Sequence, residues 1–446
     1  MTFASLGLFE PLLNALDALD HRTPTPVQAK AIPAVLSGRD VLAAAQTGTG
    51  KTGAFALPLL QRLMQQGVPA GANGVRALIL VPTRELAEQV HQDIQAYAAH
   101  LPLRSLVAYG GVSINPQMMK LRKGVDVIVA TPGRLLDLHR QNAVRFERLQ
   151  ALVLDEADRM LDLGFARELD ALFRALPERR QTLLFSATFS SEVRQMADGL
   201  LHDALSIDVS PRNAAAQSVK QWLVPVDKKR KTELFQHLWH TRRWQQALVF
   251  GKTRKGVEQL TAELIANGIA ADSIHGDKPQ PSRLKALQRF KAGEVRVLVA
   301  TDVAARGLDI EALPLVVNLD MPIVPEDYVH RIGRTGRAGS EGEAVSLVCA
   351  DEVQQLAAIE TLIRQVLPRR EEPDFVPDHR VPQTTLGGQV IKKPKKPKQK
   401  LIPGSTKDGS GASRVHLGAF QEDAKPSVKP VRAMPGFGKK SPKKPR

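Results

Sequence analysis

Two series of short apolar runs constrain the fold of this chain more than any other feature. Such runs, separated by helical stretches, are typical of strands buried on both faces of a parallel sheet. The sequence therefore predicts an α/β fold with two domains, each a parallel sheet covered by crossover helices. The first series is VLAAA (41–45), ALILV (77–81), DVIVA (126–130), ALVLD (151–155) and TLLFS (182–186), and the second is ALVF (247–250), VRVLVA (295–300), LVVNL (315–319) and AVSLV (344–348).

The domain boundaries follow from changes in pattern and charge. SPRNAAAQSV at 210–219 has no clear apolar periodicity and predicts a linker between domains at 1–209 and 220–370. A chain of 446 residues also exceeds one ordinary core. Residues 371–446 are predicted to be a disordered basic tail, because so few apolar side chains cannot offset the entropy of ordering them.

Most of the positive charge lies in that tail. Residues 387–446 contain 16 Lys and Arg and 3 Asp and Glu, a net charge of +13, which leaves +3 of the total +16 for residues 1–386. Such a basic run either binds nucleic acid or only keeps the protein in solution, and the sequence favours the first use.

The cysteine content and the N-terminus indicate the compartment. The one cysteine, Cys349, excludes an intramolecular disulfide and suits a reducing environment. The N-terminus lacks a basic region and carries Glu10 within its apolar stretch, and no apolar run approaches the length of a membrane span. We expect a cytoplasmic protein that does not bind membranes.

A candidate phosphate-binding loop follows the first apolar run. The segment QTGTGKT stands between VLAAA and the apolar stretch GAFALPLL. A strand, a glycine-bearing loop and a helix in this order surround phosphates with backbone N–H groups, while the lysine reaches the outer ones. Ala45 replaces the first glycine of the pattern GxxxxGK[ST]. The candidate nucleotide-binding residues are Gln46, Thr47, Gly48, Thr49, Gly50, Lys51 and Thr52.

An acidic cluster, VLDEAD at 153–158, follows another apolar run. By itself it could be a helix start, where acidic residues are favoured. Beside a phosphate loop it predicts a Mg²⁺ site, because Mg²⁺ binds through carboxylates, water and substrate phosphates. In that interpretation Asp155 and Thr52 hold the metal, and Glu156 orients or deprotonates the attacking water.

These motifs belong to a longer ordered series, and with it residues 1–370 resemble the DEAD-box ATP-dependent RNA helicases. The resemblance implies two tandem RecA-like domains and RNA-stimulated ATP hydrolysis coupled to local, non-processive unwinding of RNA duplexes or remodelling of ribonucleoprotein. GGVSINPQMMKLR and LPRR (367–370) are similar to the bacterial RhlE-like subgroup. The series is Phe3, PTPVQ (24–28), AQTGTGKT (45–52), PTRELA (82–87), GG (110–111), TPGR (131–134), DEAD (155–158), SAT (186–188), ATDVAARGLD (300–309) and HRIGRTGR (330–337).

The resemblance also implies how ATP is held. Gln28 would select adenine, with His21 as the nearby candidate for stacking on the base. Asp309 would lie near the ribose, at a domain interface that Arg306 joins. Arg331, Arg334 and Arg337 are spaced so closely that we expect anions between them. The expected catalytic residues are Lys51, Asp155, Glu156, Arg334 and Arg337, the last two acting as arginine fingers from the second domain.

The RNA contacts that the resemblance implies are hydroxyls, guanidiniums and glycines, which suit phosphates and carry no base-edge code. Aromatic residues make up 4% of the chain, which makes a stacking platform for bases improbable. We therefore expect sequence-independent binding of single-stranded and duplex RNA, with ribosomal or RNA-decay assemblies as further partners. Ser186 and Thr188 would couple ATP hydrolysis to unwinding. The RNA candidates are Thr83, Arg84, Gly111, Thr131, Arg134, Arg254, Gly276, Arg283 and Thr301.

Two other functions stay open at this level. One is a non-enzymatic RNA chaperone or clamp that works through its basic tail. The other is a DNA helicase or translocase, because the nucleotide motifs alone do not identify the polymer.

Overall fold

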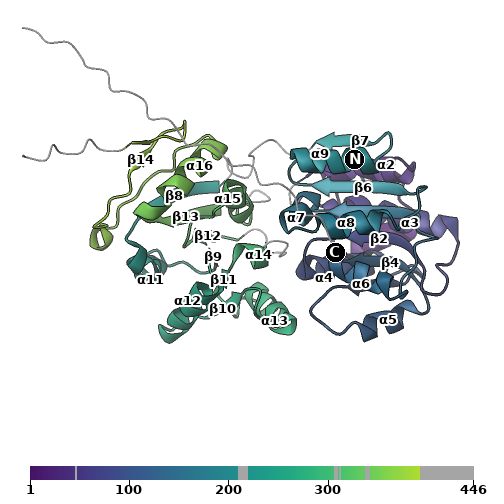
Figure 1. Cartoon of the computed structure of the whole chain (residues 1–446), viewed down its shortest axis with the longest axis horizontal. Coiled ribbons are helices and arrows are strands. Elements are labelled where there is room, and N and C mark those ends of the chain that lie inside the picture. Colours follow the sequence, from purple (N-terminus) through teal and green to yellow (C-terminus); the bar gives the residue numbers. More distant parts are fainter. Residues whose placement is uncertain (46–47, 209–218, 306–309, 311–312, 337–341, 392–446) are drawn as a thin grey trace, which may run out of the picture. The chain divides into compact units, whose positions relative to one another are not determined.

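The computed structural model of the chain describes residues 1–45, 48–208, 219–305, 310, 313–336 and 342–391. Residues 1–393 form one compact unit. It contains two α/β domains, each built on its own parallel sheet (Figure 1). No helix in these described ranges has the length and apolar character needed to cross a membrane.

The first sheet has seven parallel strands in the order β3-β4-β2-β5-β6-β1-β7. Non-consecutive neighbours in this order require crossover connections, as the sequence predicts. The strands are β1 (Val41–Ala44), β2 (Val75–Leu80), β3 (Ser105–Ala108), β4 (Val125–Ala130), β5 (Ala151–Asp155), β6 (Gln181–Ser186) and β7 (Leu205–Asp208).

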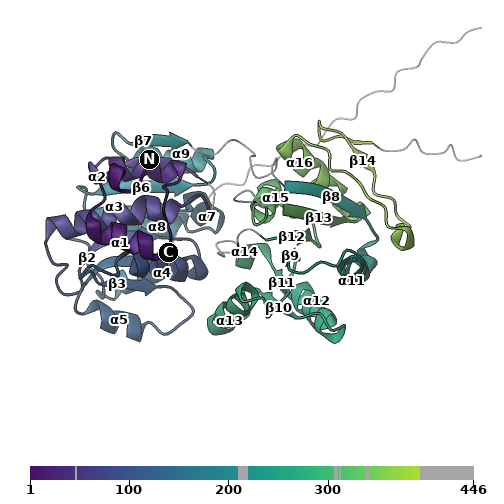
Figure 2. The same cartoon turned by 180° about the vertical axis from the view of Figure 1, so that it is seen from behind.

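Helices cover both faces of this sheet (Figures 1 and 2). Successive residues of a strand point to opposite faces, so Ala77 and Ile79 enter one core while Leu78 and Leu80 enter the other. Helices α1 to α4 pack in the first core and α6 to α9 in the second. The helices are η1 (Ala4–Leu6), α1 (Glu10–Ala18), α2 (Pro26–Leu36), α3 (Lys51–Gln66), α4 (Arg84–Tyr97), α5 (Asn115–Leu121), α6 (Pro132–Arg140), α7 (Ala157–Asp162), α8 (Ala166–Phe173) and α9 (Ser191–Leu200).

The second sheet has six parallel strands in the order β10-β11-β9-β12-β13-β8. Its strands are β8 (Val219–Pro225), β9 (Ala247–Phe250), β10 (Ala271–Ile274), β11 (Val297–Ala300), β12 (Leu315–Asn318) and β13 (Gly342–Val348). Its helices are η2 (Lys228–Arg230), α11 (Lys231–Thr241), α12 (Arg254–Ala266), α13 (Gln280–Lys291), α14 (Asp302–Ala305), α15 (Pro325–Ile332), η3 (Ala350–Glu352) and α16 (Val353–Ile363).

The segment 371–391, which the sequence analysis assigned to the tail, instead packs on the second domain. It contains η4 (Pro373–Phe375) and the antiparallel pair β14 (Gln383–Thr384) and β15 (Val390–Ile391). Phe375 and Val381 are buried in the cores of that domain, and the Arg230 guanidinium lies 4.4 Å from the centre of the Phe375 ring. A few apolar anchors are therefore enough to hold a polar segment. Of the predicted linker, 210–218 lies outside the described residues and Val219 begins β8.

Every run that the sequence analysis assigned to a strand forms one. Strands β3, β7, β8 and β10 were not predicted, and all four lie at sheet edges.

Candidate functional site

The strand order brings the candidate nucleotide motifs together. In a parallel sheet the carboxyl ends of all strands meet at one edge. Strands β5, β6 and β1 are neighbours, so the segments that follow them lie side by side. These segments carry DEAD, SAT and the phosphate loop, at 155–158, 186–188 and 46–52.

The phosphate loop passes into α3 at Gly50, which has φ +84°. This left-handed conformation favours glycine. A Cβ at Gly50 would also lie 2.6 Å from the side-chain nitrogen of Gln28, so only glycine allows this approach. Ala45, where the motif has glycine, is buried and donates its N–H to the Ser186 carbonyl, so here it continues the β1–β6 ladder. Gln46 and Thr47 lie outside the described residues.

Lys51 and Asp155 face each other in a cavity of about 480 Å³. Lys51 Nζ lies 3.4 Å from Asp155 Oδ1, and both side chains are buried. Neither atom has a hydrogen-bond partner among the described residues. Buried charged atoms normally have hydrogen-bond partners. These two atoms can therefore bind groups that enter the cavity. The cavity is also lined by Phe3, His21, Gln28, Gly48, Gly50, Thr52, Gln89, Asp93, Tyr97, Glu156 and Arg334.

The residues present fit Mg²⁺. Thr52 and Asp155 both line the cavity, and Asp155 Oδ1 is buried without a hydrogen bond. Within the described ranges no group of three or more His, Cys, Asp or Glu side chains could hold a metal by itself. Mg²⁺ usually keeps several waters and binds through one or two carboxylates plus substrate phosphates, so such a cage is not needed.

Burial and neighbouring charges shift the pKa values of Lys51 and Glu156 in the cavity. Burial alone would lower the pKa of Lys51, but the carboxylates of Asp155, Glu156 and Asp158 outweigh burial and raise it. Burial raises the pKa of Glu156, opposed by Lys51 and assisted by Asp155. Glu156 also has φ +56°, an uncommon conformation for a residue with a side chain. A carboxyl with a raised pKa, held in an uncommon backbone conformation beside a phosphate loop, marks Glu156 as a candidate functional residue.

SAT is bonded to the DEAD segment. Asp158 Oδ2 accepts from the Thr188 backbone N–H at 2.9 Å and from its hydroxyl at 2.8 Å. The Ser186 hydroxyl donates to the Thr188 carbonyl at 2.6 Å. These hydrogen bonds tie the SAT segment to the DEAD segment.

The side chain of Gln28, in the first turn of α2, bridges Thr25 and Gly50 of the phosphate loop. Its Oε1 accepts from the Thr25 N–H at 2.9 Å, and its Nε2 donates to the Gly50 carbonyl at 3.0 Å. An amide has two donors and two acceptor lone pairs, so one of each stays available to a base. The ring of His21 lies 6.3 Å from that of Tyr97, and both rings line the cavity.

The candidate arginines of HRIGRTGR differ in their surroundings. Arg334 lines the cavity with Lys51 and Glu156, and its charge acts to lower the pKa of Glu156. Arg331 has the anion that we expect beside it, and the protein itself supplies it. Its guanidinium bonds both oxygens of Asp302 at 2.5 and 2.7 Å, so the protein itself neutralises it. Arg306, Asp309 and Arg337 lie outside the described residues.

The RNA candidates of the first domain gather at the other half of its sheet, after β2, β3 and β4. Thr83 caps α4, and its hydroxyl accepts from the Leu86 N–H. The neighbouring Arg84 lies over Gly111, where a Cβ would be 2.0 Å from the guanidinium. Thr131 is the N-cap residue of α6, and Arg134 of that helix donates to the Val112 carbonyl at 2.8 Å. Because this group is separate from the cavity-lining group, the sheet edge offers two distinct surfaces.

The second domain repeats this arrangement. Arg254, Gly276 and Thr301 follow β9, β10 and β11, which are neighbours in the sheet. Arg283 on α13 differs from them, because its Nη2 pairs with Glu85 Oε1 of the first domain at 3.0 Å. Gln280 donates to the same oxygen at 2.7 Å.

Sequence reasoning missed several contributors to these surfaces. Gln89, Asp93 and Tyr97 line the cavity from α4, with spacings of about one helical turn between them. That spacing places them on one face, but no sequence signal shows that the face meets the phosphate loop. The role of Glu85 as acceptor for Arg283 was also missed, because it depends on residues far apart in sequence.

A phosphate loop whose lysine faces a buried carboxylate at the edge of a parallel sheet is typical of P-loop nucleotide hydrolases, here with a second sheet domain. The comparisons with known proteins agree. Residues 25–196 match the DEAD/DEAH box helicase family, and 230–339 match the helicase conserved C-terminal domain. The chain is 41% identical over 372 residues to the DEAD-box ATP-dependent RNA helicase CshA of Bacillus cereus, covering 83% of this chain and 70% of that protein. For CshA of Bacillus subtilis the identity is 39%, covering 84% and 74%.

Solved structures agree with this assignment. S. cerevisiae Dbp5 bound to RNA and ADP BeF3 matches with a TM-score of 0.75 and 32% identity, covering 84% of this chain and 96% of that one. This chain belongs to the DEAD-box ATP-dependent RNA helicases, and its two α/β domains are RecA-like. The expected RhlE-like subgroup finds no support among the relatives compared, which carry the name CshA.

Proposed function

We propose that this helicase binds and hydrolyses ATP in the cavity and binds RNA on the surfaces formed by the arginine, threonine and glycine candidates. The cavity holds ATP, with Lys51 on its outer phosphates, Glu156 orienting or deprotonating the attacking water, and Arg334 stabilising charge on the transferred phosphoryl group. Arg337 and Asp309 are assigned a second finger and the ribose contact from their motifs alone. The observation that carries the proposal is the buried Lys51–Asp155 pair. Within the described residues, neither Lys51 Nζ nor Asp155 Oδ1 has a hydrogen-bond partner.

Mg²⁺ would be held by Thr52 and, through water, by Asp155. When bound, it supplies neutralisation of the charge that develops on the phosphate oxygens. Lys51 assists by holding the same phosphates in place.

The RNA surfaces support local, non-processive unwinding. Arginine, threonine and glycine groups on both domains suit phosphate contacts along one strand. If closure around ATP bends that strand, it no longer fits an A-form duplex and nearby base pairs melt. Ser186 and Thr188 couple hydrolysis to this movement, a role supported by the hydrogen bonds from Thr188 to Asp158 and from Ser186 to Thr188. Hydrolysis then releases the strand.

Gln28 is proposed to select adenine. We expect Gln28→Ala to narrow the preference for ATP over GTP in RNA-stimulated turnover, because the free donor and acceptor of the amide complement an adenine edge. The measurement is kcat/KM for both nucleotides. Gln28 also donates to the Gly50 carbonyl through its Nε2. Gln28→Glu is therefore the matched control, because it keeps an oxygen that accepts from the Thr25 N–H and loses the Nε2 donor. Equal turnover of ATP and GTP by the unmodified protein would remove this role.

The function is tested by comparing polymers on a chain shortened after Lys393, which retains the β14–β15 pair. We expect RNA to stimulate its ATPase more than DNA of the same sequence, and strand separation to require ATP. DNA stimulation equal to that of RNA would favour a DNA translocase. ATP-independent strand separation that is lost with the tail would favour a chaperone.

The tail is proposed to tether RNA non-specifically through its net charge of +13 at 387–446. For single strands the log affinity falls with log salt by about 0.7 per phosphate neutralised, so the shortened chain of the same experiment should show a flatter slope. We also propose ribosomal or RNA-decay assemblies as further partners, the cytoplasm as location and, from GGVSINPQMMKLR and LPRR alone, the RhlE-like subgroup. A free, buried Cys349 suits the cytoplasm.

A further inference from the structure

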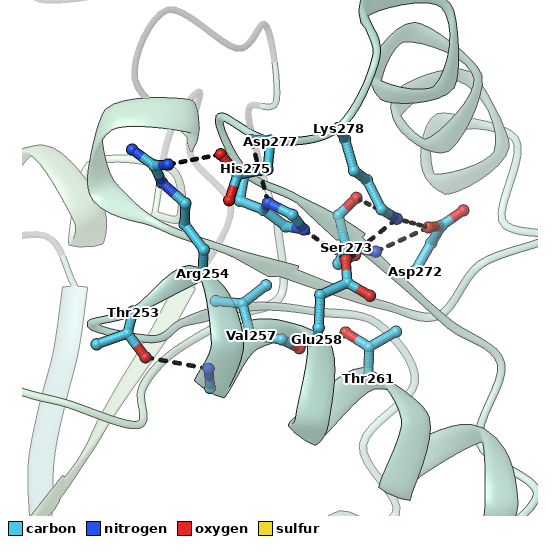
Figure 3. Close-up of polar contacts among 11 residues, drawn as sticks. Thr253, Arg254, Val257, Glu258, Thr261, Asp272, Ser273, His275, Asp277 and Lys278 are labelled. Atoms are coloured by element: carbon cyan, nitrogen blue, oxygen red, sulfur yellow. Dashed lines mark hydrogen bonds and ion pairs between the residues drawn. The ribbon is translucent and has the colours of Figure 1, made fainter.

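A polar network at the end of edge strand β10 has no role in the functions above. After Ile274, residues 275–277 turn toward α13, and Glu258 of α12 is directed at this turn (Figure 3). Glu258 Oε1 accepts from the Ser273 hydroxyl at 2.6 Å and lies 2.5 Å from His275 Nε2. Ser273 and His275 are 0% and 5% exposed, whereas the Glu258 side chain is 49% exposed, so buried groups of the β10 end are tied to α12 at the domain surface.

The partners of His275 define its tautomer. The Asp277 backbone N–H donates to Nδ1 at 3.3 Å, so Nδ1 presents its lone pair and the ring proton is on Nε2, which donates to Glu258. Burial would raise the pKa of Glu258, but the hydrogen bonds from Ser273 and His275 and the charge of Lys278 hold it below its usual range. An ionised carboxylate therefore orients the ring, and the ring orients the backbone at Asp277.

The turn presents two donors to solvent. Gly276 is exposed, and within the described residues its N–H has no acceptor. A Cβ at Gly276 would lie 3.8 Å from Arg254 Nε, so the guanidinium is adjacent. Arg254 Nη1 pairs with Asp277 Oδ1 at 2.5 Å (Figure 3). A backbone N–H beside a guanidinium is a suitable arrangement for one phosphate group.

We propose that Glu258 and His275 are positioning residues for RNA binding, holding the 275–277 turn so that Gly276 and Arg254 act on the same phosphate. This inference rests on the proposed function, which makes Arg254 and Gly276 RNA contacts. His275 and the half-exposed Glu258 orient the turn, and Gly276 and Arg254 contact the strand. Neither Glu258 nor His275 touches RNA.

The test separates RNA binding from chemistry in the full chain. Glu258→Ala should raise the RNA concentration for half-maximal ATPase roughly tenfold, the size of one charge-assisted hydrogen bond, while kcat at saturating RNA and the KM for ATP stay unchanged. Glu258→Gln should recover most of the loss, because its amide oxygen still accepts. His275→Phe, which keeps a ring without its hydrogen bonds, should behave as Glu258→Ala. Glu263→Ala, on the same helix, is the matched control and should have no effect.

A double-mutant cycle with Arg254→Ala shows whether the pair acts through the turn. In the Arg254→Ala background Glu258→Ala should cost less than it does alone, because one of the positioned donors is gone. Fully additive losses, or no change in RNA half-saturation for both Glu258→Ala and His275→Phe, would overturn the inference. If Arg254→Ala itself has no effect on RNA half-saturation, the proposed RNA contact is wrong and the inference falls with it.

Discussion

Replacing Arg334 with alanine should reduce RNA-stimulated ATP turnover by roughly 10³- to 10⁵-fold, the range of arginine fingers. Arg334 is buried and lines the cavity with Lys51 and Glu156, although it comes from the second domain. Its charge would stabilise the transferred phosphoryl group, so the loss should appear in kcat at saturating ATP and RNA. Nucleotide affinity should change far less.

Arg334→Lys is the matched control. It keeps the positive charge but loses the planar fork that bonds two phosphate oxygens, so we expect it to recover only part of the rate. A second measurement uses residues 1–208, which contain the complete seven-stranded sheet. If that fragment hydrolysed ATP at the rate of the full chain with RNA, Arg334 would have no role in catalysis.

Glu156→Gln should lower ATP hydrolysis by about 10²- to 10⁴-fold, the usual contribution of a general base, while ATP binding is kept. The amide has nearly the shape of the carboxylate, and Lys51 and the phosphate loop are unchanged. Single-turnover phosphate release measures the chemical step, and a fluorescent ATP analogue measures binding.

The pH dependence gives this prediction a second readout. Burial raises the pKa of Glu156 above its ordinary value, and the base acts in its ionised form. The rate of the unmodified protein should therefore rise as pH rises through that raised pKa, and Glu156→Gln should lose this rise. Near-normal turnover by the variant, or a rise that survives in it, would assign the base to another group.

The sequence predicted the interior of each sheet and missed its edges. The strands β2, β4, β5 and β6 are buried along their whole length, so apolar residues dominate their sequences. The edge strand β7, with the sequence LSID, has one buried residue of four. Such a strand is partly exposed and needs polar side chains, which removes the apolar signal.

The same distinction applies to the site. Local motifs made Lys51, Asp155, Glu156 and Thr188 candidates, because the residues of a phosphate loop or a carboxylate cluster are contiguous in sequence. The sequence did not identify Asp302 as the anion beside Arg331, since only the fold brings that carboxylate to its guanidinium.

By itself the sequence determined the fold class, the two sheet domains and the residues of the nucleotide motifs, because each depends on short-range patterns of apolar and chemically specialised side chains. Only the tertiary structure decided which loops are neighbours, since strand order is set by packing between distant segments. It placed DEAD, SAT and the phosphate loop side by side at the ends of β5, β6 and β1. Only the tertiary structure shows that the 371–391 segment packs on the second domain and that Glu258 bonds His275. These contacts join residues that no local sequence pattern relates.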